Sequence, residues 1–224
     1  HPVVYAEWLG ASGAPTILVY GHYDVQPSDP LDKWQSAPFQ PQVRDGRLYG
    51  RGVSDDKGPM LIPIKVAEAF LAVSGRLPIN LKFLIEGEEE IGSPSLEPFI
   101  REHAALLAAD FVLSADGAMW RADLPSVTVS SRGLAGLAFS LRCAGRDLHS
   151  GRHGGAAPNA LHAMARLVAS LHGADGSVAV DGFYDSVIEL DDADRAEVQA
   201  LPFDDKEYLA QIDAMMLVGE PDYC

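Results

Sequence analysis

The chain has 224 residues, of which 47% are hydrophobic, enough to bury the core of one large or two small domains. Its formal net charge of −15 argues against nucleic acid as a partner, because phosphate binding needs basic patches. No apolar run approaches the roughly 18 residues of a membrane span, so no membrane partner is expected. Two cysteines, Cys143 and Cys224, make no disulfide framework or metal knuckle, which favours a reducing, cytoplasmic setting.

Strands and helices alternate in the first half of the sequence. Short apolar runs, rich in β-branched residues or bounded by turn residues, predict strands at 16–20, 79–85, 110–114 and 127–131. Between the strands, apolar residues at helical spacing predict helices over 59–74 and 93–109. Gly75 supplies the stop of the first helix, and Ser93 is the expected N-cap of the second. This alternation is typical of an α/β sheet with at least some parallel strands.

The pattern changes after about residue 130. Residues 134–143 predict a strand and 157–173 a helix with one apolar face, and acidic helical segments follow from Asp191 and Asp204. We therefore divide the chain into a larger domain at 1–131 and a smaller α+β domain at 132–224.

Metal-type ligands follow three of the four apolar runs of the first half. In open α/β sheets, groups at the carboxyl ends of strands converge on one crevice. Together with an acidic pair before the first helix, they form a mixed histidine and carboxylate set suited to zinc or manganese. The residues of this set are His22, Asp24, Asp55, Asp56, Glu86, Glu88, Glu89, Glu90 and Asp116.

Each member of this set also has an ordinary structural explanation. His22 and Asp24 would suit a hydrogen-bonded turn, and Asp55 would suit the N-terminus of a helix. The glutamate run at 86–90 could be a solvated loop, as charge runs usually are. Because carboxylates directly after an apolar strand repel one another unless a cation compensates them, the combination favours a metal site.

Separated motifs in a fixed order carry a family resemblance. "GHYDVQP", "DGRLYGRGVSDDKGP", "IEGEEEIGS", "SADG" and "RDLHSG" followed by "GG" and "N" span nearly the whole chain. Together they closely resemble the dinuclear-zinc exopeptidases that include carnosinase, aminoacylase and the acetylornithine and succinyl-diaminopimelate deacylases, known as the M-twenty metallopeptidases. The residues of these motifs are most similar to those of the carnosinase-type dipeptidase branch. The resemblance implies a mixed sheet flanked by helices, plus a smaller lid domain.

The resemblance also implies a role for each matching residue of the site. It makes Asp55 a bridge between two divalent metal ions, zinc or else manganese, with His22 and Asp116 on the first ion and Glu90 on the second. Asp24 would orient the imidazole of His22. Glu89 would be the general base that takes a proton from the water attacking an amide carbonyl.

A second histidine, His149, lies far from these motifs in sequence. Taken alone, "GRDLHSGRHGG" reads as a polar turn before a helix. In the family that the chain resembles, this motif lies in the lid domain, which also forms a homodimer, and its histidine reaches the partner subunit's active site. The resemblance thus implies that His149 stabilises the transition state, with Asn159, Gly154 and Gly155 as weaker candidates for substrate contact.

Two parts of the family pattern do not occur in this sequence. The family's last metal ligand, a histidine, and an arginine that binds the substrate carboxylate both follow the lid domain. We therefore interpret the chain as a fragment, poorly active alone, of an active hydrolase.

Three functions remain open at this stage. The leading hypothesis is a metal-dependent dipeptidase, and the runner-up is an N-acyl-amino-acid deacylase that uses the same water attack. A non-catalytic scaffold that retains the fold is the third, and the intact ligand set argues against it. A nucleotide-binding protein is disfavoured, because "GRGVSDDKG" lacks a phosphate-binding lysine motif and its acidic pair would repel phosphates.

Overall fold

The computed structural model describes residues 2–117, 119, 121, 123–128, 131 and 133–219. The chain divides into two compact units, His1–Gly133 and Leu134–Cys224, which we call the first and second units. Within the described residues, no helix is both long and apolar enough to cross a bilayer.

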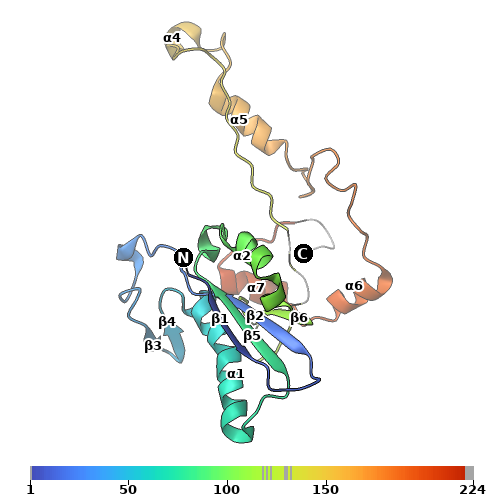
Figure 1. Ribbon diagram of the computed structural model, residues 1–224. Coiled ribbons are helices and arrows are strands. Elements are labelled where there is room, and N and C mark those ends of the chain that lie inside the picture. The colour runs from blue at the N-terminus through green and yellow to red at the C-terminus, as the bar shows by residue number, and fades with distance from the viewer. Residues whose placement is uncertain are drawn as a thin grey trace. The chain divides into compact units, whose positions relative to one another are not determined.

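A four-stranded mixed sheet forms the centre of the first unit (Figure 1). Its strands, in the order β1-β5-β2-β6, are β1 (Val4–Trp8), β5 (Asn80–Glu86), β2 (Thr16–His22) and β6 (Phe111–Ser114). β2 runs parallel to both β5 and β6, whereas β1 is an antiparallel edge strand. The α/β class and three of the predicted strands are therefore confirmed, and β1 was not predicted.

Alternation along β2 divides the core between the two faces of the sheet. Leu18 packs with Leu84 of β5, and its neighbour Val19 packs with Leu81 on the opposite face. Successive side chains of a strand point to opposite faces, so an apolar run such as 16–20 indicates a strand covered on both sides.

Helices cover both faces. α1 (Gly58–Ser74) contributes Ala67 to the cluster around Val19, and it ends where Gly75 adopts φ 67° and donates its N–H to Leu71 O. α2 (Leu96–Glu102) and α3 (Ala104–Leu107) contribute to the cluster around Leu18. The first helix is thus confirmed, and Figure 1 shows it running along the sheet.

The second predicted helix, 93–109, is only partly right. Ser95, not Ser93, precedes α2, and the chain breaks at His103, whose ψ of 22° separates α2 from α3. Ser93 instead adopts a positive φ of 50° and donates its hydroxyl to Glu86 Oε1 at 2.8 Å. The bond to the end of β5 competes with capping, so the helix begins later.

Shorter elements complete the first unit. Antiparallel pairing joins β3 (Gln42–Arg44) to β4 (Arg47–Tyr49) across Asp45 and Gly46. Three short helical turns follow other strands or loops: η1 (Leu31–Lys33), η2 (Val53–Lys57) and η3 (Glu89–Ile91). η2 and η3 carry the acidic residues singled out in the sequence.

Two predicted strands are not formed. Val127, Thr128 and Ser131 are not in a strand, and the other two residues of 127–131 lie outside the described residues. Residues 134–143 are irregular and mostly exposed, so that prediction was wrong. A strand is stable only when a neighbouring strand takes up its backbone hydrogen bonds, and this segment pairs with none among the described residues.

The second unit consists of short helices joined by irregular segments. They are α4 (Ser150–His153), α5 (Ala160–Ala169), α6 (Asp192–Gln199) and α7 (Asp205–Ile212). The helix predicted within 157–173 and the two acidic helices are confirmed. Asp191 and Asp204 are their N-caps, each accepting backbone N–H groups with its side chain.

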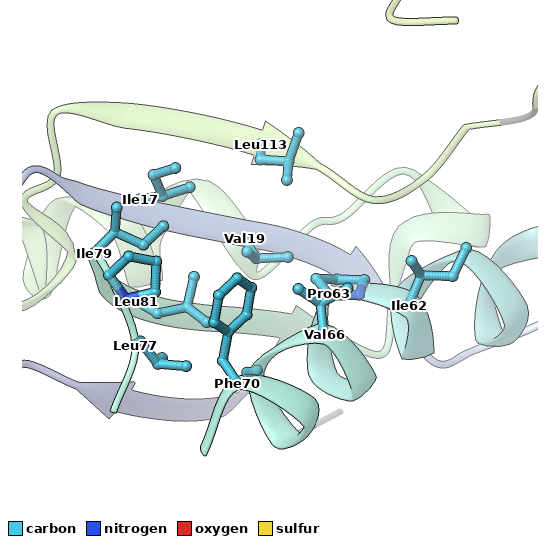
Figure 2. A pocket seen from close by; sticks show the side chains of 12 residues that line it. Ile17, Val19, Ile62, Pro63, Val66, Phe70, Leu77, Ile79, Leu81 and Leu113 are labelled. Carbon is cyan, nitrogen blue, oxygen red and sulfur yellow. The ribbon is translucent and has the colours of Figure 1, made fainter. Parts of the chain in front are cut away.

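An apolar cavity of about 290 Å³ lies between α1 and the sheet (Figure 2). Ile62, Val66 and Phe70 of α1 line one side, and residues of β2 and β5 with Leu113 of β6 line the other. Its lining has no titratable side chain. It therefore offers space for apolar groups but no chemistry of its own.

Candidate metal centre

His22 is the last residue of β2 and is completely buried. Its Nδ1 lies 3.2 Å from the carbonyl oxygen of Asp24 and 3.3 Å from that residue's Oδ1. Because a carbonyl oxygen can only accept, Nδ1 carries the proton and donates it to Asp24. The other nitrogen, Nε2, is thereby turned toward the carboxyl edge of the sheet.

Three carboxylate oxygens lie near Nε2. It lies 3.0 Å from Asp55 Oδ1 and 3.9 Å from both Glu89 Oε2 and Asp116 Oδ2. A neutral imidazole with its proton on Nδ1 would have no donor to bond at Nε2 and would face three carboxylates. A cation is therefore needed between these groups, either a proton on Nε2 or a metal ion.

The donor set fits a divalent metal ion. One ligand atom each from His22, Asp55 and Asp116 lies within 4.8 Å of the other two. The histidine is buried and both aspartates are exposed, so the ion could be approached from solvent. One imidazole and two carboxylates are ligands that zinc and manganese accept. Three residues predicted as ligands are thus brought together by the fold.

The chain supplies these residues from three sheet-edge segments. His22 ends β2, Asp55 lies in η2 just before α1, and Asp116 follows β6, which is parallel to β2. Because parallel strands end at the same edge, residues 33 and 94 positions after His22 reach its imidazole (55 − 22 and 116 − 22).

The mutual proximity of these groups shifts their proton affinities. Burial lowers the pKa of His22, but the hydrogen bond with Asp55 and the charges of Glu89 and Asp116 outweigh it and raise the pKa above its ordinary value. The pKa of Glu89 is also raised, by burial first and then by neighbouring carboxylates, against the opposing effect of His22. Neighbouring carboxylates contribute to both shifts, although burial is the larger cause at Glu89.

Asp24 connects the histidine to the glutamate loop. Besides contacting His22, its Oδ1 accepts the backbone N–H of Glu89 at 3.3 Å and its Oδ2 that of Glu90 at 3.0 Å. The role of Asp24 in orienting the imidazole remains a prediction. Its carboxylate holds the first turn of η3 against the end of β2.

Glu90 does not join the group of His22, Asp55 and Asp116. Its carboxylate is instead held by Gln26, whose backbone N–H donates to Oε1 at 3.1 Å and whose Nε2 donates to Oε2 at 2.8 Å. Sequence reasoning did not single out Gln26, although its position two residues after Asp24 in "HYDVQP" was the available signal.

Asp56 is the second residue that sequence reasoning left without a role. It is completely buried, and its Oδ2 accepts the backbone N–H of His22 at 3.2 Å. Burial raises its pKa, and the charges of Asp116 and Asp55 add to the shift. A Cβ at Gly21 would lie 2.8 Å from Asp56 Oδ2, so a glycine is required beside His22.

The other two glutamates of the run, Glu86 and Glu88, accept hydrogen bonds that hold neighbouring segments in place. Glu86 is buried at the end of β5, where its Oε1 accepts the hydroxyls of Tyr20 at 2.6 Å and Ser93 at 2.8 Å. Glu88 Oε2 accepts the backbone N–H of Ser95 at 3.2 Å. The run is therefore not a uniform solvated loop, because each glutamate has its own environment.

The predicted residues of the second unit are surrounded by local contacts. His149 Nδ1 accepts the backbone N–H of Gly151 at 3.0 Å and caps α4. Asn159 Oδ1 caps α5 by accepting from Leu161 N at 2.9 Å and His162 N at 3.3 Å. Gly154 ends α4 with extended φ and ψ, and Gly155 has φ 78°. These contacts account for local structure, and the substrate roles of the four residues remain predictions.

Comparisons with known proteins find dipeptidases among the relatives of this chain. The chain is 35% identical over 209 residues to the Beta-Ala-His dipeptidase of Homo sapiens, covering 92% of this chain and 41% of that protein. It is 32% identical over 210 residues to the Cys-Gly metallodipeptidase DUG1 of Saccharomyces cerevisiae, covering 92% and 44%. The chain thus spans less than half the length of these relatives.

A solved structure shows the same relationship. The crystal structure of an M20 family metallo-carboxypeptidase from Sulfolobus solfataricus matches with a TM-score of 0.74 and 32% identity, over 99% of this chain and 50% of that one. The family model described as peptidase family M20/M25/M40 matches residues 18–221, which include all the acidic residues at the sheet edge and His22. The chain belongs to peptidase family M20/M25/M40.

Proposed function

We propose that the complete protein containing this chain is a metal-dependent dipeptidase that hydrolyses the amide bond of dipeptides or short peptides. The observation that carries the proposal is His22 Nε2, which faces the carboxylates of Asp55, Glu89 and Asp116. The dipeptidase names of similar proteins support the substrate class.

In this proposal His22, Asp55 and Asp116 would hold a first divalent ion, and Glu90, with Asp55, would help to hold a second. Zinc is the preferred metal, with manganese as the alternative. When bound, the ions would polarise the substrate carbonyl and make the attacking water more acidic. Asp24 holds the Nδ1 proton of His22, which would leave the lone pair of Nε2 available to a metal ion.

Glu89 acts as the general base. It is 37% exposed and 3.9 Å from His22 Nε2, so its carboxylate borders the ligand group while remaining open to solvent. Its carboxylate can accept a proton from the attacking water and return it to the leaving amine. No side chain needs to form a covalent intermediate with the substrate.

We assign residues 1–131 to the catalytic domain and 132–224 to part of a lid domain through which two copies pair. His149 would then stabilise the transition state of the partner's site, and Asn159, Gly154 and Gly155 would contact the substrate. The family membership and the family pattern that these residues match support this assignment. The free thiol of Cys143 is consistent with a reducing, cytoplasmic location.

The test is Glu89→Gln in the complete protein loaded with zinc or manganese, assayed on dipeptides and on N-acyl amino acids. General base catalysis predicts a loss of about 10²- to 10⁴-fold in kcat with metal affinity retained. Glu102→Gln, on the exposed end of α2, is the matched control and should leave kcat unchanged.

The substrate panel separates the alternatives. Cleavage confined to N-acyl amino acids would make the protein a deacylase with the same site. A folded protein that binds both metal ions and turns over neither substrate class would contradict the catalytic proposal and leave a non-catalytic scaffold.

A further inference from the structure

Glu89 and Glu90 are adjacent, chemically identical and anchored in the same way through their backbone. Both N–H groups donate to the carboxylate of Asp24, at 3.3 and 3.0 Å. Asp24 therefore positions the turn but does not distinguish one glutamate from the other. Any difference in role must come from what each side chain contacts.

We propose that Gln26 is a positioning residue that holds the Glu90 carboxylate as a ligand and leaves Glu89 as the mobile base. The inference rests on the proposed function and assigns Gln26 to the same site. Gln26 lies in the loop after β2, two residues beyond Asp24, so the loop that carries the His22 partner also carries the clamp on Glu90.

Three contacts make up the clamp. The Gln26 backbone N–H donates to Glu90 Oε1 at 3.1 Å, and Gln26 Nε2 donates to Glu90 Oε2 at 2.8 Å and to the Glu90 backbone oxygen at 3.2 Å. Each carboxylate oxygen thus receives one N–H and keeps lone-pair capacity for a metal ion. Hydrogen bonds to a charged acceptor are the stronger kind, so these donors fix the orientation of the carboxylate.

Glu89 has no comparable clamp among the described residues. Its carboxylate lies 3.9 Å from His22 Nε2, and its backbone N–H bonds to Asp24. A general base must move a proton between the attacking water and the leaving group, which a carboxylate fixed by a donor on each oxygen does poorly. The asymmetry therefore matches the roles proposed for the two residues.

The substitution that tests the clamp is Gln26→Met, which retains the length of the side chain and removes the amide donor. The backbone contact to Oε1 remains. Losing a partner of a metal ligand typically costs about 10- to 100-fold in metal affinity, so we expect a loss in that range for one of the two ions. Gln40→Met, at an exposed position outside the site, is the matched control.

A double-mutant cycle decides whether Gln26 acts through Glu90. Titration calorimetry with Mn²⁺ is performed on the complete protein, Gln26→Met, Glu90→Gln and the double variant. If the inference is right, Gln26→Met has almost no further effect once Glu90 is changed, and only Gln26→Met, not Gln40→Met, alters the visible spectrum of the Co²⁺-loaded protein. Equal losses in both backgrounds would overturn it.

Gln26→Glu supplies an independent variant. It places a second carboxylate beside Glu90 Oε2 in place of the donor, so it should weaken metal binding more than Gln26→Met does. An effect no larger than that of Gln40→Met would overturn the inference. Failure of the proposed function looks different, because metal binding and its dependence on Gln26 would be intact while the wild-type protein turned over no substrate.

Discussion

Local sequence signals produce helices in both units of the chain, but the two units differ in how much they bury. Every described residue that is buried lies in the first unit, where both faces of the sheet are covered by helices. The helices of the second unit have good N-caps, yet Leu161 of α5 is 79% and Val198 of α6 56% exposed. Capping and helical spacing are therefore sufficient to start a helix, whereas burial needs a second layer that local sequence does not supply.

This contrast also explains where the candidate chemistry lies. Groups such as His22 and Asp56 can be desolvated only where a sheet and its helices exclude water around them. In the second unit, His149 and Asn159 remain exposed and bond to the backbone of their own helices.

Core truncation should separate the two units most clearly. Leu84→Ala removes a side chain that is 3% exposed, and we expect a loss of about 2–5 kcal/mol in the free energy of unfolding. Leu161→Ala in α5 should change it by less than about 0.5 kcal/mol, because nothing is uncovered. Urea unfolding followed by circular dichroism measures both. Comparable losses would mean that Leu161 is buried in the complete protein.

A smaller effect is expected from Lys82, a charged residue buried in β5. Its Nζ donates to Leu106 O at 2.6 Å and Ala108 O at 2.8 Å, and so secures the end of α3. Lys82→Met leaves both carbonyls without this donor and should cost about 1–3 kcal/mol. Lys65→Met is the control, because it breaks only an exposed pair with Glu68. If the two variants unfold at the same urea concentration, the buried contact contributes nothing.

Capping in the second unit provides a prediction near 1 kcal/mol. Asn159→Ala removes the cap of α5 and should destabilise that helix by about 1 kcal/mol, whereas Asn159→Asp keeps an equally good cap. Hydrogen exchange of the α5 amides should rise only for the alanine variant. A loss of kcat/KM in the aspartate variant without faster exchange would instead support the substrate contact predicted from the family pattern.

The smallest effect is expected in the pH dependence of stability in the metal-free protein. The raised pKa values of His22 and Glu89 mean that the folded state keeps protons that the unfolded chain releases. Each contribution is complete below the unfolded pKa, about 6.5 for histidine and 4.3 for glutamate, and is lost as pH rises through the folded value. With a chelator present, the midpoint of thermal unfolding should therefore fall as pH rises through this window.

Glu89→Gln is the control for that measurement. Glutamine does not titrate, so the fall should flatten at its acidic end, and only modestly, since solvent screens a carboxylate that is 37% exposed. Adding Zn²⁺ at high pH should restore stability, because the ion supplies the positive charge that the protons supplied. A midpoint that rises with pH in the chelated protein would contradict the charge balance of the site.

Sequence reasoning identified the elements whose signal is contained in consecutive residues. The apolar runs at 16–20, 79–85 and 110–114 are strands, and Gly75 ends α1 at a positive φ that favours glycine. Sequence reasoning failed where the structure of a segment depends on contacts with another part of the chain. Residues 134–143 have a strand-like composition but form no pairs in the described chain, and Ser93 bonds to Glu86 instead of capping a helix.

The order of motifs along the chain determined by itself the α/β class, the family and the residue types of the site, because each depends on local pattern or spacing. Only the tertiary structure determined which oxygens surround His22 Nε2. It also determined the contact of Gln26 with Glu90, which lies 64 residues later in the sequence. The reason is physical. Parallel strands bring distant loops to one edge, and the direction of each side chain there depends on donors contributed by other segments, which no local stretch of sequence contains.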